Sequence, residues 1–322
     1  MNRLLLKKAI LECRTLWLGC AVALALFCSI RVWIVAQFSM ERFQTIVEQF
    51  REFEKLSPVP FEQLFTYAGR IAVTFDEPIV VLCIAVWAIA RGSDCVSGEL
   101  GRGTMEMLLA QPFRRSQIIG SQAAVTVVGA ALLMLVTWLS IYIGVQLTTV
   151  KEEPPPATWK VPLFGFEVPN LLADPEPVEV PMSERVDSRV FAPATFNLFC
   201  LTVFLAGLST LLSSMGRHRS TTIGIMVGIY IVAAAMKILA VASESWSWLR
   251  YGTFFMLYEP QAITQMVVKD PSQAWVIVTQ ASETEPAALG PLGYSLPLLG
   301  LGVLAYLLAG LIFQRRDLPA PL

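Results

Sequence analysis

Charge is scarce in this chain of 322 residues: only 15% are Asp, Glu, Lys or Arg, whereas 55% are hydrophobic. Soluble domains usually carry about 25% charged residues. The shortage therefore indicates that much of the surface faces lipid rather than water. The formal net charge of -1 gives no general attraction for nucleic acid, so no nucleic-acid partner is expected.

The sequence also lacks the motifs of common catalytic and cofactor sites. His218 is the only histidine, and its position between Arg217 and Arg219 favours a basic turn over metal binding. No G-x-x-x-x-G-K-[ST] segment is present to bind phosphate, and neither G-x-S-x-G nor H-E-x-x-H occurs. We therefore expect no catalytic residue, cofactor site or metal site, and no ATPase activity of the chain's own.

Cysteine is present six times but never as C-x-x-C, which gives no support to a metal ribbon or a thioredoxin-like site. We expect all of these residues to be small apolar fillers or free cytoplasmic thiols. They are Cys13, Cys20, Cys28, Cys83, Cys95 and Cys200.

Long apolar runs are what the sequence has instead. A helix needs about 20 mostly apolar residues to cross a bilayer, and backbone in lipid must satisfy its own hydrogen bonds. Six runs meet this requirement, which predicts an all-α integral membrane protein with a single six-span domain over 1–322. The expected spans are 15–37, 78–98, 118–148, 191–215, 220–242 and 291–313.

The basic residues predict the orientation of these spans. With a cytoplasmic N-terminus, twelve Lys and Arg residues fall in about 55 inner residues and ten in about 120 outer residues. Both termini are therefore expected in the cytoplasm, in a multi-pass protein of the plasma membrane. The inner residues are Arg3, Lys7, Lys8, Arg14, Arg91, Arg102, Arg114, Arg115, Arg217, Arg219, Arg315 and Arg316.

Three large segments, 38–77, 149–190 and 243–290, are expected outside the membrane. Apolar residues recur at helical spacing within 43–54, which fits either an amphipathic helix or a plain solvated connector. Eight prolines in the second segment oppose a long helix there and favour an extended loop. Aromatic residues in the third favour short interfacial or re-entrant helices near 246–268.

Polar residues in or beside the spans carry further expectations. Arg31 and Lys237 lie near outer helix ends, where snorkelling to the interface is expected. Arg91 and Asp94 have the spacing to pair on one helix face. The first fifteen residues are amphipathic, so we expect them to lie on the inner leaflet and to enter the first span through a bend.

The inner loop 99–117 reads as a short capped helix. Gly101 and Gly103 are expected to end the preceding helix and to allow a sharp turn, with Thr104 as the N-cap of the next. A helix over 105–110 should follow, and Pro112 should stop it.

This loop resembles the loop between the second and third spans in permease subunits of ABC-type-2 exporters. The ending over 313–318 is also similar to the close of the sixth span in that family. The resemblance implies that the loop is a coupling helix, which docks on a separate ATPase subunit. The matching residues are Glu99, Gly103, Thr104, Leu108, Leu109, Pro112 and Arg115.

The resemblance also implies a dimer of permeases, either homodimer or heterodimer, within membrane lipid. ATP and Mg²⁺ would be bound by the ATPase subunit and not by this chain. Glu99, Glu106, Arg114 and Arg115 are the residues expected to make the contact. Charge or alanine variants there should lose transport and coupling while insertion stays normal.

Two departures from the family pattern leave the subfamily and the cargo open. They are the polar pair Arg91 and Asp94 in the second span and the proline-rich outer segment. A secondary transporter working without ATP is an alternative function, although no paired broken spans are visible. A membrane scaffold without transport is another alternative.

Overall fold

The computed structural model describes residues 3–38, 65–111, 114–152, 158–160, 167–169, 178–279 and 288–316. The expected amphipathic segment 43–54, most of the proline-rich segment and Pro112 lie outside these residues.

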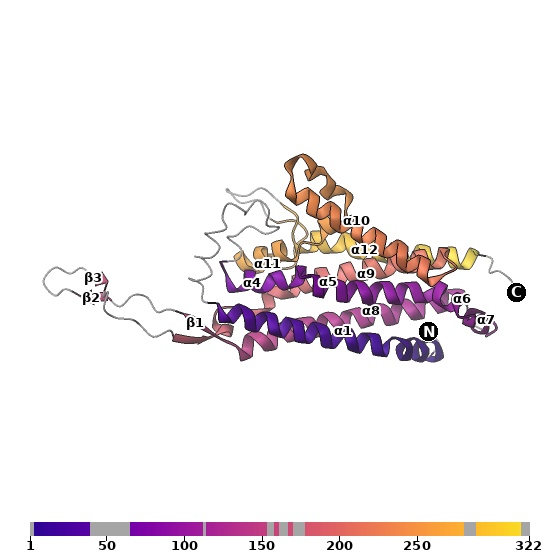
Figure 1. Cartoon of the computed structure of the whole chain (residues 1–322), viewed down its shortest axis with the longest axis horizontal. Helices are drawn as coiled ribbons and strands as arrows, with labels where there is room; N and C mark the ends of the chain where they lie inside the picture. Colours follow the sequence, from indigo (N-terminus) through magenta and orange to yellow (C-terminus); the bar gives the residue numbers. More distant parts are fainter. Residues whose placement is uncertain are drawn as a thin grey trace.

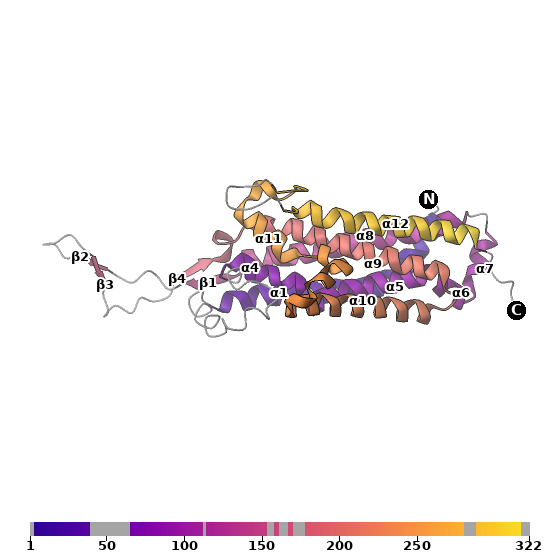
Figure 2. The ribbon, with the colours of Figure 1, turned by 90° about the horizontal axis from the view of Figure 1, so that it is seen from above.

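Six helical stretches in the described residues are long and apolar enough to cross a membrane, which confirms the predicted fold class. They lie along one common direction in an elongated bundle (Figures 1 and 2). The second stretch, Tyr67–Gly101, contains α4 (Tyr67–Ala72), a 3₁₀ turn η2 (Val73–Asp76), α5 (Pro78–Ser93), a π-helical turn η3 (Asp94–Gly98) and α6 (Glu99–Gly101). The others are α1 (Arg3–Gln37), α8 (Arg115–Leu147), η5 with α9 (Ser188–Phe191, Ala192–Met215), α10 (Arg219–Ala242) and α12 (Pro291–Arg315).

The amphipathic N-terminal segment is not a separate element. It continues without a break into the first span, so that α1 is one helix of 35 residues. The bend expected between the two parts is therefore wrong. Leu5, Ala9 and Cys13 on the amphipathic part are buried, which means that this part packs on the bundle as well as the span does.

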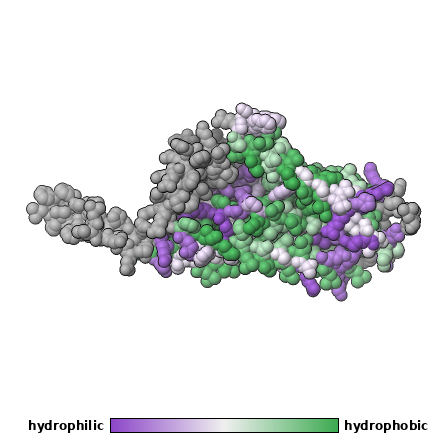
Figure 3. Space-filling model, viewed as in Figure 1, coloured by the Kyte–Doolittle hydropathy of each residue, from purple (hydrophilic) through white to green (hydrophobic). Residues whose placement is uncertain are grey.

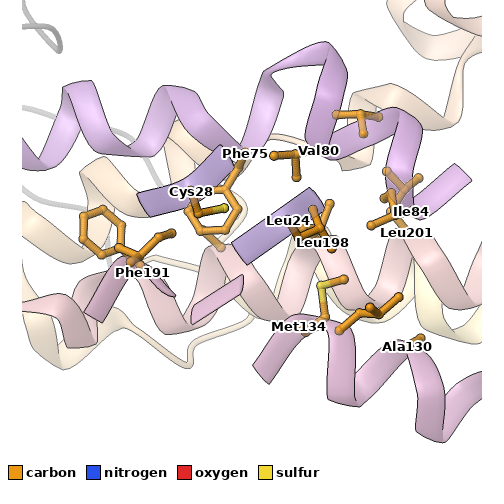
Figure 4. Close-up of a cluster of buried hydrophobic side chains, with 14 of the residues drawn as sticks. Leu24, Cys28, Phe75, Val80, Ile84, Ala130, Met134, Phe191, Leu198 and Leu201 are labelled. Carbon is orange, nitrogen blue, oxygen red and sulfur yellow. The ribbon is translucent and has the colours of Figure 1, made fainter. Parts of the chain in front are cut away.

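The core lies between α1, α5, α8 and α9. Leu24 and Cys28 from α1 lie close to Phe75 and to Met134 of α8, as Figure 4 shows. Leu198 of α9 completes this group, and α9 has buried side chains on almost every turn. All six cysteines are free thiols, five of them buried, which confirms their predicted role as apolar fillers.

Helix α10 packs much less than α9. Only Thr222, Met226 and Ala233 of its residues are buried. It leans away from the other helices towards the hairpin end of the bundle, the end that carries β1 (Figure 1). Several of its apolar side chains, among them Ile231, Val232 and Ile238, are exposed, which suits a helix that faces lipid.

An apolar surface covers the middle of the bundle on the face that Figure 3 shows. On α1 this surface includes Leu18, Val22, Leu26 and Ile30, four exposed side chains that follow one another at i, i+4 spacing. A stripe of this kind would cost free energy in water but suits lipid. Hydrophilic residues gather at the end of the bundle away from β1, where α6 and α7 (Thr104–Leu109) lie.

The hairpin end holds all the strands that the structure describes. Strands β1 (Thr149–Glu152) and β4 (Val178–Pro181) pair antiparallel, with Thr149 opposite Pro181, and β2 (Thr158–Lys160) pairs with β3 (Glu167–Pro169). Short helices cover this end, as expected near 246–268. They are η4 (Met182–Glu184), η6 (Glu244–Gly252), η7 (Phe254–Leu257), α11 (Pro260–Lys269) and η8 (Pro271–Gln273).

Ion pairs at the hairpin end join the spans to one another and to the start of α11. Arg31 lies 3.3 Å from Glu77, and Lys237 lies 3.3 Å from Glu259 and 4.0 Å from Asp76. The ammonium of Lys237 also donates to the carbonyl of Tyr258 at 3.1 Å. Both basic residues thus have carboxylate partners within the protein, where sequence alone predicted only contact with the interface.

Candidate coupling site

The backbone around Gly103 turns sharply at the end of the bundle that carries α7, here called the α7 end. Gly103 has a φ of 70°, which is left-handed backbone that glycine adopts at little cost. The predicted turn is therefore confirmed. Thr104 is the first helical residue after it rather than the N-cap, so that part of the prediction is wrong.

Glu99 is the most enclosed charged residue of the turn, since its side chain is 1% exposed. It accepts from the ammonium of Lys8 at 2.7 Å and from Arg102 at 3.1 Å. The hydroxyl of Thr104 also donates to this carboxylate. A buried carboxylate is stable only with such partners, because it has lost its water. Glu99 consequently holds the start of α7 against α1.

Asp94 extends this arrangement towards α10. Its carboxylate accepts from Arg102 at 2.7 Å and lies 3.4 Å from the guanidinium of Arg219. The hydrogen bond from Arg102 to Asp94 raises the pKa of Arg102, with a further contribution from Glu99. The expected pair of Arg91 with Asp94 is wrong, because Arg91 donates to Gln122 of α8 instead. We call Lys8, Asp94, Glu99, Arg102 and Arg219 the Glu99 cluster.

The π-helical turn η3 brings Asp94 into this position. A π turn holds one extra residue, and such turns often lie at functional sites. Gly98 lets the chain pass the carboxylate, since a Cβ there would lie 2.3 Å from Oδ1 of Asp94. Ser213 of α9 supports the turn, because its hydroxyl accepts from the backbone N–H groups of Ser97 at 2.9 Å and Val96 at 3.2 Å.

Helix α7 has one fixed side and one free side. Met105 is buried with Val96, Ile119 and Phe313 in a small apolar cluster. On the other side Glu106 is exposed, and Met107 is 72% exposed. The helix thus presents a carboxylate beside an apolar side chain to whatever lies beyond the end of the bundle.

Arg115 faces inward, unlike Arg114. Its guanidinium donates to the carbonyls of Phe313 at 3.3 Å and Arg316 at 2.6 Å, which ties the start of α8 to the end of α12. Arg316 in turn donates to the carbonyls of Ser214 and Gly216. Arg114 is exposed. The similar ending noticed in the sequence therefore lies against the same loop.

The structure brings only some of the predicted contact residues together. Glu99, Gly103 and Thr104 form the root of α7, while Glu106 is exposed and Leu108 half-buried on the helix. Leu109 is the last residue of α7, and Pro112 lies outside the described residues. Sequence reasoning missed Lys8, Arg102 and Arg219 as partners. The signal available was an acid in an apolar run, which requires a cation nearby.

A family model described as "ABC-2 family transporter protein" matches residues 7–174, more than half of the chain. The chain belongs to the ABC-2 transporter family. No curated protein matches the sequence. The matched part runs from α1 past α8 and contains four of the five residues of the Glu99 cluster. This ABC-2 protein is thus a multi-pass membrane permease with a role in transport.

Proposed function

We propose that this permease is the membrane half of an ATP-driven exporter, and that α7 is its coupling helix. A separate ATPase subunit binds ATP and Mg²⁺ and docks at the α7 end. The permease itself carries the translocation path as a homodimer or heterodimer.

The arrangement of α7 is the observation that carries this proposal. Its root is fixed by the buried Glu99 and by Met105, whereas Glu106 and Met107 face outward. Because the N-terminal end of α7 is held in place, a displacement of α7 is transmitted to the elements that hold it. Those elements are α1, through Lys8, and α10, through Arg219.

The distribution of basic residues supports a cytoplasmic α7 end. Arg3, Arg102, Arg114, Arg219 and Arg316 all belong to helix ends or turns on this side of the bundle. Cytoplasmic segments are rich in Lys and Arg, so this end is the one expected inside the cell. Both termini then lie in the cytoplasm, where an ATPase has access to ATP.

Transport by such an assembly requires two states of the permease. Closure of the ATPase subunits on ATP favours one position of α7, and hydrolysis favours the other. Because the Glu99 cluster joins α7 to two spans, a change in its position changes the tilt of those spans.

Met107→Cys provides a direct test of the proposal, because this position is exposed and its neighbours hold the helix in place. A membrane-impermeant thiol reagent should label it in inside-out vesicles and not in intact cells. A thiol-to-amine cross-linker should join it to a co-expressed ATPase subunit. The cross-link should weaken when ATP binding closes the ATPase pair.

Val178→Cys is the matched control, since it is exposed at the hairpin end. It should be labelled in intact cells and should form no cross-link with the ATPase. Labelling of Met107→Cys from outside intact cells would overturn the orientation. Transport that continues unchanged without the ATPase subunit would overturn the ATP-driven mechanism and favour a secondary transporter.

A further inference from the structure

An apolar groove of about 400 Å³ runs along the outside of the bundle between α1 and α8. The two helices lie side by side there (Figure 1). Ile10 of α1 and Val128 of α8 line it and are 53% and 58% exposed, so the groove opens to the surroundings of the bundle. Its volume falls in the range of small-molecule and lipid pockets.

Two tryptophans give the groove a fixed wall. Trp17 donates its indole N–H to the carbonyl of Gly129 at 3.0 Å, and Trp87 donates to the carbonyl of Thr126 at 3.2 Å. Both indoles have their polar atom satisfied by the protein. Trp17 is half-buried and offers hydrocarbon to the groove, whereas Trp87 is fully buried and holds the floor of the groove in place. The groove therefore suits a chain of methylene groups.

One edge of this groove is basic. Arg14 lines the groove itself. Arg3 and Lys7 precede it by eleven and seven residues on the same helix, and this spacing places all three on one face. In the part of the chain that the structure describes, none of the three has an ion-pair partner, whereas the adjacent Lys8 is taken by Glu12 and Glu99.

Arg14 also lies at the depth where lipid headgroups are expected. Arg14 and Arg31 are 17 residues apart on α1, a rise of about 26 Å, close to the thickness of a hydrocarbon core. The stripe of exposed apolar residues from Leu18 to Ile30 fills the interval. Arg14 thus marks one boundary of the hydrocarbon and Arg31 the other.

We propose that this groove binds one anionic phospholipid from the leaflet at the α7 end. An acyl chain lies against Trp17 and Val128, and the phosphate is held by Arg14 with Lys7. Because Lys8 and Lys7 are adjacent, the lipid would lie beside the Glu99 cluster and restrain α1. This inference goes beyond the proposed function, because the binding requires no ATPase subunit.

Native mass spectrometry of the full chain in detergent would test this binding, with phosphatidylglycerol and phosphatidylcholine of identical acyl chains. The wild type should bind phosphatidylglycerol more tightly than phosphatidylcholine. Lys7→Gln and Arg14→Gln should each reduce the affinity for phosphatidylglycerol about fivefold. Val128→Phe should reduce binding of both lipids, because the added ring fills the groove.

Matched variants separate this site from general effects. Arg189→Gln with Arg250→Gln removes two exposed charges at the other end and should leave the preference intact. Ile143→Phe places the same ring on an exposed position of α8 outside the groove and should have no effect. Wild-type lipid preference in Lys7→Gln and Arg14→Gln, or wild-type binding in Val128→Phe, would overturn the proposal.

Two further measurements exclude other occupants. Inorganic phosphate should not displace the lipid at concentrations where phosphatidylglycerol does, and equal competition would show a free-anion site instead. The bound lipid should also survive addition of the purified ATPase subunit. Its displacement would show that protein covers the basic edge, which would overturn the lipid site while leaving the ATP-driven mechanism standing.

Discussion

Two groups of ion pairs, one at each end of the bundle, use the same residue types in different surroundings. Glu99 at the α7 end is 1% exposed and has two cations within 3.1 Å. At the hairpin end, Lys237 pairs with Asp76 and Glu259 at longer distances, and the Glu259 side chain is 35% exposed. We call Lys237, Asp76 and Glu259 the Lys237 cluster.

The difference shows which charges the fold depends on. Removing one partner of a buried pair leaves an uncompensated charge and costs about 3–5 kcal/mol, whereas exposed pairs contribute about 0–1 kcal/mol. The Glu99 cluster should thus behave as a structural unit. The Lys237 cluster fastens short helices to the ends of spans that already pack on their neighbours.

Loss of charge at Glu99 should have the largest effect. Glu99→Gln removes the buried carboxylate that Lys8 and Arg102 share, and these two cations then keep only Glu12 and Asp94. Because both cations are partly exposed, we expect a loss of about 3 kcal/mol of stability, together with loss of transport. Thermal unfolding in detergent and transport in vesicles measure the two effects. Glu77→Gln at the hairpin end is the control, with an expected loss of about 0–1 kcal/mol. Equal losses in both variants would remove the distinction between the two ends.

Gly98→Ala probes the same cluster without changing any charge. The new methyl group would lie too close to Asp94, and we expect a loss of about 1–3 kcal/mol. Gly120→Ala on α8 meets nothing within 4 Å and should be neutral or slightly stabilising. The midpoint of thermal unfolding compares the pair, and an unchanged midpoint in Gly98→Ala would show that η3 can move aside.

Ser213→Ala separates the support of the π turn from its charges. The hydroxyl that accepts from Val96 and Ser97 is lost, which should cost about 1–2 kcal/mol. Ser214→Ala is a close control, because Ser214 is buried but donates only to a carbonyl of its own helix. If both variants unfold at the same temperature, the support from α9 contributes nothing measurable.

Lys237→Gln should have the smallest effect on stability. Its partners are partly exposed, so the expected loss is about 0–1 kcal/mol. Thermal unfolding should therefore resemble the wild type, and transport should be retained. A loss as large as that of Glu99→Gln would show that the two ends depend equally on their ion pairs.

Sequence patterns were sufficient for the spans and for the turn at Gly103. Length and hydropathy decide whether a run can cross a bilayer, and a left-handed turn favours glycine. They were not sufficient for the partners of Glu99, because Lys8 and Glu99 are 91 residues apart and meet only when α1 packs on the bundle. The spacing of Arg91 and Asp94 also misled, because each side chain has a partner on another element: Arg91 donates to Gln122 of α8, and Asp94 pairs with Arg102 and Arg219.

The unbroken course of α1 has a mechanical consequence. Lys8 and Arg31 stand on the same rod, 23 residues or about 35 Å apart, and each grips a carboxylate from the second stretch. If the second stretch slides along α1, both ion pairs must therefore break or re-form at the same time. Movements at the two ends of the bundle are in this way coupled through one continuous helix, without any intervening loop.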